Sequence, residues 1–404
     1  MVVQDCAESG KKRSEAILNN PHLLKMIAKE HESVLKAHLN QAQYLLLVLL
    51  IGVLQTVKAV KLELLANALP LPILFESRRK KIQRFLDWEA FSIENCWFPW
   101  LKQLVAQYWS ANDLLYIAID RTSWGWANIL MVSLIWNHRA WPIYWIIFDK
   151  KGSSNLKEQQ AVLVKVIGLL EDYRLVVLGD REFCSVKLGK WLSDQDTYFC
   201  LRQKQDTYLQ QDAVWLEMRE LGLKPGMSLF LNEVNITKQL GFGTFNVACK
   251  WKRKYRGFCP NEGWYILTNL GSLDEAIRSY QKRFCIEEMF RDFKAGGYKL
   301  EGTKVEGVRL QRIVLLIAIA YTTASLGGKA IQKMGIQKYI GRVEIPKQQK
   351  RRHSSFYIGL HAHNWVRQWQ NQWEIVEELI RINRHKLPYY RKGLRAMELT
   401  LSTI

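Results

Sequence analysis

Residues 114–149 read LLYIAIDRTSWGWANILMVSLIWNHRAWPIYWIIFD, in which three apolar runs are separated by short polar turns. The runs span 114–120, 127–136 and 141–149, and each is rich in β-branched or aromatic residues. This composition is typical of buried strands, and such short turns join strands that lie beside one another. The segment therefore predicts a meander of three strands.

The chain after this meander alternates between helical and strand patterns. A helix, a short buried strand, a second helix and a second strand are predicted at 155–172, 175–180, 183–195 and 197–204. The resulting order β-β-β-α-β-α-β is that of the ribonuclease H-like fold, an α/β fold with a mixed sheet and flanking helices. A Rossmann fold is the competing interpretation, but the sequence has no GxGxxG after a strand and no Walker A loop.

Composition narrows the classes of partner and compartment. The 58 Lys and Arg outnumber the 38 Asp and Glu, and the net charge of +20 favours a polyanion, with nucleic acid first and an anionic membrane surface second. The 7 cysteines include no CxxC pair, which argues against a zinc knuckle or a disulfide framework and favours a reducing cytoplasm. The apolar run 44–54 is about half of a bilayer crossing, so a buried helix is predicted there.

Two predicted strands end in aspartate, at Asp120 and at Asp180. For either residue alone, a turn or helix-cap role is the more common explanation. If the first and fourth strands are neighbours, however, both carboxylates emerge at the same edge of the sheet. Carboxylates are the ligands that suit Mg²⁺, and phosphodiester chemistry uses two such ions about 4 Å apart. A third acid is then expected.

The stretch SYQKRFCIEEMFRDFK (279–294) supplies a candidate for that third acid. On a single helix at about 100° per residue, Tyr280, Arg283, Glu287 and Lys294 share one stripe beside the apolar face. Glu288 and Asp292 are predicted to face solvent, which selects Glu287. The alternative is that Arg283 and Glu287 form only an ordinary ion pair one helical turn apart.

The spacing of Tyr280, Arg283, Glu287 and Lys294 resembles the Tyr-Arg-Glu-Lys signature of the insertion-sequence 4 family of DDE transposases. IDRTSW (119–124) is similar to the first-aspartate block of that family, and LGDREF (178–183) is similar to the second. The resemblance is specific from about 115 to 325 and vague over the last eighty residues.

The resemblance implies roles for individual residues. Asp120, Asp180 and Glu287 would be catalytic and would bind two Mg²⁺ or Mn²⁺ ions. Tyr280, Arg283 and Lys294 would hold phosphates near the cut. Further implied or suggested DNA contacts are Trp264, which would stack on a flipped base unless it is simply a core residue, and Arg202 and Lys204 at the end of the fifth strand.

Five regions are predicted on this basis. They are a helical N-terminal DNA-binding region, the first part of the ribonuclease H-like core, a β-rich insertion, the second part of the core, and a helical basic C-terminal region for dimerisation or DNA contact, at 1–107, 108–205, 206–263, 264–325 and 326–404.

The predicted function is that of a bacterial DNA transposase. It would bind the terminal inverted repeats of its element, cut them in a metal-dependent reaction and join them to target DNA, as a homodimer on double-stranded ends in the cytoplasm near the nucleoid. One alternative is a transposase-derived DNA-binding protein without catalytic activity. Another is a membrane-surface protein. The apolar run 44–54 is short and isolated, so we predict that the protein has no membrane partner.

Overall fold

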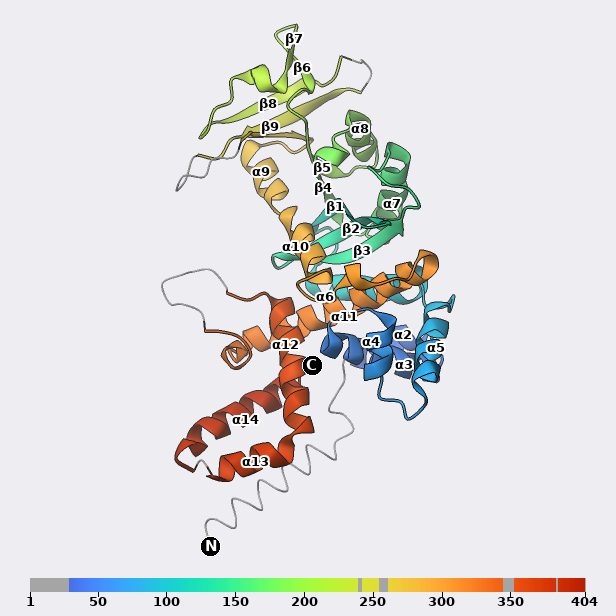
Figure 1. Ribbon diagram of the computed structural model, residues 1–404. Coiled ribbons are helices and arrows are strands. Elements are labelled where there is room, and N and C mark those ends of the chain that lie inside the picture. Colours follow the sequence, from blue (N-terminus) through green and yellow to red (C-terminus); the bar gives the residue numbers. More distant parts are fainter. Residues whose placement is uncertain (1–28, 239–241, 254–260, 344–351, 383, 404) are drawn as a thin grey trace. The chain divides into compact units, whose positions relative to one another are not determined.

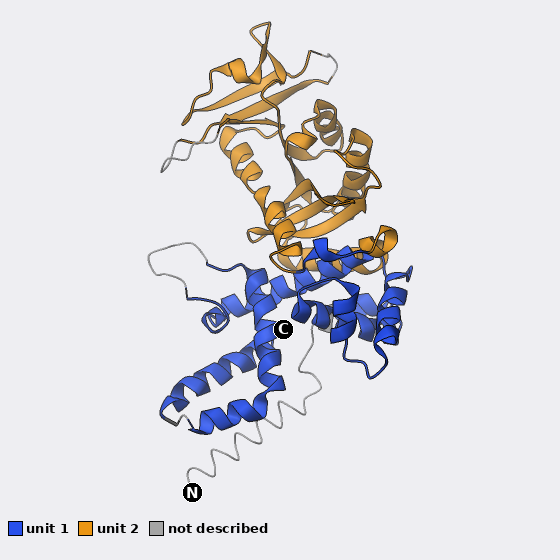
Figure 2. Cartoon of the chain, viewed as in Figure 1, with its two compact units in different colours: residues 1–92, 298–304, 312–404 blue, residues 93–297, 305–311 orange. Residues whose placement is uncertain are grey.

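The structure is a computed structural model that describes residues 29–238, 242–253, 261–343, 352–382 and 384–403 (Figure 1). The chain forms two compact units, coloured separately in Figure 2. Unit 1 consists of residues 1–92, 298–304 and 312–404, and unit 2 consists of residues 93–297 and 305–311. The predicted terminal regions lie partly outside the described residues, and the roles assigned to the five regions stay predictions.

Unit 2 is built on an eight-stranded sheet with the order β3-β2-β1-β4-β5-β10-β9-β8. Its strands are β1 (Leu114–Trp124), β2 (Ala127–Trp136), β3 (Arg139–Ile147), β4 (Arg174–Gly179), β5 (Tyr198–Arg202), β8 (Ser228–Asn235), β9 (Thr244–Lys250) and β10 (Trp264–Thr268). β1, β2 and β3 pair antiparallel, whereas β4 pairs parallel with both β1 and β5. This mixed sheet has the predicted ribonuclease H-like order, so the predicted fold class is confirmed.

The β-rich insertion is confirmed, and much of it continues the main sheet. β9 pairs with β10 and β8 pairs with β9, both antiparallel. Among the described residues of the insertion, the hairpin of β6 (Tyr208–Gln211) and β7 (Val214–Glu217) forms a separate two-stranded sheet. A strand edge carries unpaired N–H and C=O groups, and β9 satisfies those that β10 would otherwise expose.

Helices cover both faces of the sheet in unit 2. α7 (Leu156–Leu169) packs on β2 and β3 and α8 (Val186–Asp194) packs on β5, whereas α9 (Leu273–Gln281) and α10 (Phe284–Phe293) lie across the sheet on its other side (Figure 1). α6 (Phe98–Tyr108) follows the π-helical turn η1 (Ile93–Trp97). The indole N–H of Trp97 donates to the carbonyl of Pro142 at 3.0 Å, which anchors this turn to β3.

Unit 1 is helical throughout its described part. It contains α2 (Lys29–Lys36), α3 (Gln41–Val57), α4 (Leu62–Ala68), α5 (Phe75–Leu86), most of α11 (Gly307–Lys333), α12 (Ser355–Asn371), α13 (Trp373–Ile382) and α14 (Leu387–Leu401). The apolar run 44–54 lies in α3 and is largely buried, as predicted. α11 is long and apolar enough to cross a membrane, but its most apolar window is 78 % buried, which is the environment of a core helix.

Candidate active site

Asp120 lies inside β1 rather than at its end. The sequence predicts a strand that stops at Asp120, but β1 continues to Trp124 because it remains paired with β2. The parallel pairing with β4 does stop here, since its last pair is Ile119 with Gly179. Asp120 and Asp180 therefore directly follow the two residues of the last pair between β1 and β4. The prediction that the first and fourth strands are neighbours is confirmed.

Asp180 begins a turn that the preceding glycine permits. A Cβ on Gly179 would lie 2.8 Å from the Cβ of Phe183, so a larger residue does not fit. Asp180 caps the short helix η2 (Arg181–Phe183), and its Oδ1 accepts a hydrogen bond from the backbone N–H of Glu182 at 2.8 Å. The capping role is real, but it uses only one of the two carboxylate oxygens.

The stretch 279–294 forms two helices rather than the single helix assumed from the sequence. α9 ends at Gln281 and α10 begins at Phe284, and Lys282 and Arg283 form a tight turn between them. The backbone N–H groups of these two residues donate to carbonyls three residues earlier, each at 3.0 Å. Such winding advances by about 120° per residue, so a wheel drawn at 100° misplaces Tyr280 relative to α10.

Arg283 is the buried cation of the site. Its side chain is 7 % exposed, its Nη1 donates to Oδ2 of Asp120 at 3.3 Å, and its Nη2 donates to Oε1 of Glu287. The ion pair with Glu287 that was weighed as an alternative is therefore present. The same guanidinium also joins Glu287 to Asp120, which an isolated helical pair would not do.

The prediction that Glu288 and Asp292 face solvent is wrong for Asp292, whereas Glu288 remains partly exposed. Asp292 is buried and pairs with Nε of Arg139 at 3.2 Å, and Glu288 pairs with Nη1 of the same residue at 3.1 Å. Burial raises the pKa of Asp292 to about 6, although Arg139 opposes the shift. The prediction failed because the partner comes from β3, far away in sequence, and a helical wheel contains no information about it.

The charges around Asp120 act strongly on one another. The pKa of its carboxyl group is raised to about 7, with burial as the largest cause. The charge of Arg283 acts to lower this pKa, and the charges of Asp180 and Glu287 act to raise it. Asp120 is therefore a buried carboxyl group whose pKa is also raised by two neighbouring carboxylates. A bound cation would stabilise the charged form of such a group.

The donor chemistry at this position fits a hard divalent cation. Asp120 and Asp180 offer carboxylate oxygens from adjacent strands, and oxygen donors are the ligands that Mg²⁺ and Mn²⁺ accept. Within the described residues, no three His, Cys, Asp or Glu side chains come close enough to hold one ion. Glu287 is joined to Asp120 through Arg283, and this guanidinium occupies the space between the two acids.

A first prediction concerns the metal-free protein. The folded chain keeps a proton on Asp120 up to about pH 7, whereas the usual pKa of this group is 3.8. The folded state therefore binds more protons than the unfolded state in this window, and the free energy of unfolding falls as the pH rises, by at most about 4 kcal/mol. Urea unfolding in EDTA at several pH values should show this slope, and Asp120→Asn should remove it. An unchanged slope in that variant, with exposed Asp194→Asn as the control, would contradict the assignment.

The remaining signature residues differ in exposure. Tyr280 is 1 % exposed and packs edge to face against Trp264, with ring centroids 5.1 Å apart. Trp264 is half-buried, and Phe284 and the ammonium group of Lys252 also lie near its ring. Lys294 follows α10, and its Nζ lies 3.4 Å from the carbonyl of Ser123 at the end of β1. Lys294 is thus on the β1 side of the site, whereas Tyr280 and Trp264 form an aromatic pair.

The structure separates Arg202 from Lys204. The guanidinium of Arg202 pairs with Glu262, which also pairs with Arg181. Lys204 is exposed, and its charge lowers the pKa of Cys184, although burial raises that pKa overall. Their assignment as DNA contacts stays a prediction.

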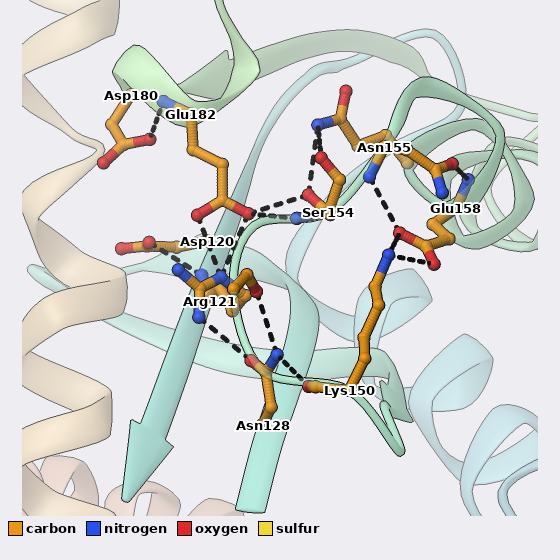
Figure 3. Close-up of polar contacts among 11 residues, drawn as sticks. Asp120, Arg121, Asn128, Lys150, Ser154, Asn155, Glu158, Asp180 and Glu182 are labelled. Atoms are coloured by element: carbon orange, nitrogen blue, oxygen red, sulfur yellow. Dashed lines mark hydrogen bonds and ion pairs between the residues drawn. The ribbon is translucent and has the colours of Figure 1, made fainter.

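Arg121 and Glu182 form an ion pair that the sequence patterns did not indicate. Both lie in the motifs IDRTSW and LGDREF, yet only the aspartates of these motifs received roles. Nε of Arg121 donates to both carboxylate oxygens of Glu182, at 3.0 and 2.9 Å (Figure 3). The signal that could have revealed the pair is the placement of opposite charges just after two aspartates on neighbouring strands, with Arg121 one residue after Asp120 and Glu182 two residues after Asp180.

Comparisons with known proteins place these observations in a family. A cryo-EM structure of a piggyBac transposase synaptic complex with hairpin DNA aligns with 89 % of this chain and 80 % of its own, at 10 % identity and a TM-score of 0.43. No curated protein matches the chain significantly. The family model for the transposase DDE domain matches residues 119–323, which is just over half of the chain and includes Asp120, Asp180 and Glu287. The chain therefore belongs to the family of transposase DDE domains.

Proposed function

We propose that this protein is the DNA transposase of a bacterial insertion sequence of the insertion-sequence 4 type. It would bind the terminal inverted repeats of its element and carry out cut-and-paste transposition in the bacterial cytoplasm. The observation that supports this most strongly is the convergence of two aspartates from neighbouring parallel strands with Arg283 and Glu287, all inside the segment that the family model matches.

In this proposal, Asp120, Asp180 and Glu287 hold two Mg²⁺ or Mn²⁺ ions. Bound ions would supply Lewis-acid activation of the attacking oxygen and would stabilise the leaving oxygen. Asp120 and Asp180 present their carboxylates from a rigid sheet, and each already uses one oxygen to accept a backbone hydrogen bond. Arg283 sits between Asp120 and Glu287, so release of Glu287 from this guanidinium would accompany closure of the three-acid group.

The basic side chains around the acids would hold the DNA backbone. Lys294 contacts Ser123 at the end of β1. Arg202 is the last residue of β5, and exposed Lys204 lies just after this strand. Basic side chains that contact phosphates position the DNA without reading its sequence. The net charge of +20 supports a polyanionic partner, and the proposed substrate is a pair of transposon ends held by a homodimer, followed by target DNA.

A cleavage assay tests this proposal directly. The substrate is a labelled duplex with the inverted repeats that flank the gene, incubated with the full chain and Mg²⁺. We expect a nick or a double-strand break at the repeat end, and none when EDTA replaces the metal. Cleavage that continues unchanged in EDTA would contradict a metal-dependent reaction.

A second candidate function is DNA binding without catalysis. Its support is that no three acidic, histidine or cysteine side chains in the described residues gather around one ion, while Arg283 pairs with Glu287. This protein would bind the repeat ends but would give no product with Mg²⁺ or Mn²⁺ at any concentration. The cleavage assay therefore separates the two candidates.

A further prediction concerns Lys294. If its ammonium group contacts a phosphate, Lys294→Ala should weaken end binding several-fold and should reduce the slope of log affinity against log salt by about 1. Fluorescence anisotropy measures the binding of end DNA at salt concentrations from about 50 to about 200 mM, and the affinities give this slope. The matched control is Lys190→Ala on α8, which removes a charge that is paired with neighbouring Asp194. Equal slopes for native and Lys294→Ala would contradict the contact.

A further inference from the structure

A chain of hydrogen bonds that runs through Arg121 and Glu182 connects the two aspartates (Figure 3). Oδ1 of Asp120 accepts from the backbone N–H of Arg121 at 2.7 Å, and Oδ1 of Asp180 accepts from the backbone N–H of Glu182 at 2.8 Å. The side chains of Arg121 and Glu182 then bind each other through Nε, at 3.0 and 2.9 Å. The backbone of Arg121 therefore orients Asp120, and the backbone of Glu182 orients Asp180. The side chains of Arg121 and Glu182 bind each other.

Glu182 is an acid near the site, but its oxygens are already engaged. Besides the two hydrogen bonds from Arg121, its Oε1 accepts from the backbone N–H of Ser154 at 2.9 Å and from the hydroxyl of Ser154 at 2.8 Å. The Glu182 side chain is 14 % exposed. A carboxylate that accepts this many hydrogen bonds is held as a negative partner for Arg121, which argues against a role as a metal ligand.

The pair is anchored to three further parts of the sheet unit. Nη1 of Arg121 donates to Oδ1 of Asn128 on β2 at 3.0 Å. The amide of Asn128 donates to the carbonyls of Lys150 and Gly152 in the loop before α7, at 2.9 and 3.0 Å. In α7, Gln159 donates to the hydroxyl of Ser154 at 3.0 Å. Buried networks of this kind restrict the arrangement of their members to one geometry.

Such restriction matters because the two aspartates repel each other. Asp120 and Asp180 directly follow Ile119 and Gly179, the last pair between parallel strands β1 and β4, so their negative charges lie at the same edge of the sheet. Free side chains would turn apart, or Asp120 would turn fully toward Arg283. Groups that orient metal-binding carboxylates typically change metal affinity by about 10- to 100-fold when they are removed.

We propose that Arg121 and Glu182 are positioning residues, which hold the carboxylates of Asp120 and Asp180 in the relative orientation that divalent-cation binding requires. This inference rests on the proposed metal-dependent function. It assigns Arg121 and Glu182 no contact with metal or DNA.

The test is a Mn²⁺ titration of the full chain without DNA, followed by the electron paramagnetic resonance signal of free Mn²⁺. The variants are Glu182→Gln, which keeps the shape of the side chain but removes its charge, Arg121→Met, and Asp180→Asn. Leu192→Ala in α8 is the matched control, because Leu192 is fully buried and its loss destabilises the same unit. Thermal unfolding is recorded for every variant, and Ser154→Ala provides a milder change that leaves Arg121 and Glu182 paired.

We expect Glu182→Gln and Arg121→Met each to weaken Mn²⁺ binding by about 10- to 100-fold. Ser154→Ala should have a smaller effect of the same kind, and Leu192→Ala should lower the unfolding temperature without changing Mn²⁺ affinity. The double variant should bind no more weakly than the weaker single variant, because both changes break one interaction.

Three results would overturn the inference. One is Mn²⁺ affinity within about twofold of native in both Glu182→Gln and Arg121→Met while Asp180→Asn loses binding, since the pair would then be merely structural. Another is loss of binding in Glu182→Gln with native affinity in Arg121→Met, which would make Glu182 a ligand. The third is absence of Mn²⁺ binding in the native chain, which would overturn the proposed metal-dependent function as well, whereas the first two leave that function standing.

Discussion

Asp180→Asn is expected to reduce metal-dependent cleavage of repeat-end DNA by at least about 10³-fold, with end binding close to native. The substitution keeps the side chain's size and the acceptor oxygen that caps η2 through the N–H of Glu182, so the local fold should persist. It removes one negative charge from the pair that Asp120 and Asp180 form on neighbouring strands. The measurement is a single-turnover cleavage rate, together with a gel-shift titration of the same DNA.

Glu287→Gln should show the same separation of cleavage from binding. Its control is Glu288→Gln, the adjacent residue of α10, which pairs with Arg139 rather than with Arg283. We expect near-native cleavage in the control. A Glu287→Gln variant that cleaves as fast as Glu288→Gln would remove Glu287 from the catalytic group and leave Asp120 and Asp180 to be explained differently.

Arg283→Met is expected to change both the stability of the metal-free chain and the ionisation of Asp120. The Arg283 charge lowers the pKa of the Asp120 carboxyl, so its removal should raise that pKa above about 7. Loss of the charged hydrogen bonds to Asp120 and Glu287 should lower the free energy of unfolding by about 2 to 3 kcal/mol at pH 8. The loss should be smaller at pH 5, where Asp120 is protonated and needs no partner.

Urea unfolding of the metal-free chain at pH 5 and pH 8 measures this difference. Arg291→Met is the matched control, because Arg291 lies on α10, which begins directly after Arg283, is mostly exposed and pairs with Glu288. Exposed pairs contribute little, so this control should change stability by less than about 1 kcal/mol at either pH. An equal loss at both pH values in Arg283→Met would show that Asp120 and Arg283 are not electrostatically coupled.

The strand order of the core could be predicted because each strand carries its own local pattern. The run 127–136 matches β2 residue for residue, and the runs that predict β1, β3, β4 and β5 differ from the observed strands only at their ends. The end of β1 was misplaced because Arg121 to Trp124 are held in the strand by β2 rather than by apolar character. The continuation of the main sheet through β10, β9 and β8 was also not predicted, since it depends on the pairing of β10 with β5, in which Ile266 lies opposite the distant Arg202.

The part of the candidate site that could be predicted is the part that depends on which strands are neighbours in the sheet. Asp120 and Asp180 follow from two parallel strands, and the spacing in 279–294 selects Glu287, which the structure connects to Asp120 through Arg283. The helix break at Lys282 and Arg283 was not visible, because both residues are good helix formers and the turn is set by packing on either side.

The polar partners of the site were the least predictable part. Arg139 pairs with Asp292 across more than 150 residues, and Ser154 reaches Glu182 from a loop. Each of these side chains is ordinary in its local sequence. Only the folded sheet shows that they bury their charge or hydroxyl group against a specific partner, so patterns of helical or strand period could not identify them.

The most direct test of the account is the position of Mn²⁺ in crystals of the full chain bound to its repeat-end DNA. The anomalous signal of the metal locates it independently of any assumed ligand. We expect a peak within about 2.5 Å of carboxylate oxygens of both Asp120 and Asp180, with Glu287 released from Arg283 and turned toward the metal. A metal peak that touches neither aspartate, or bound DNA with no metal while Arg283 still joins Asp120 to Glu287, would contradict it.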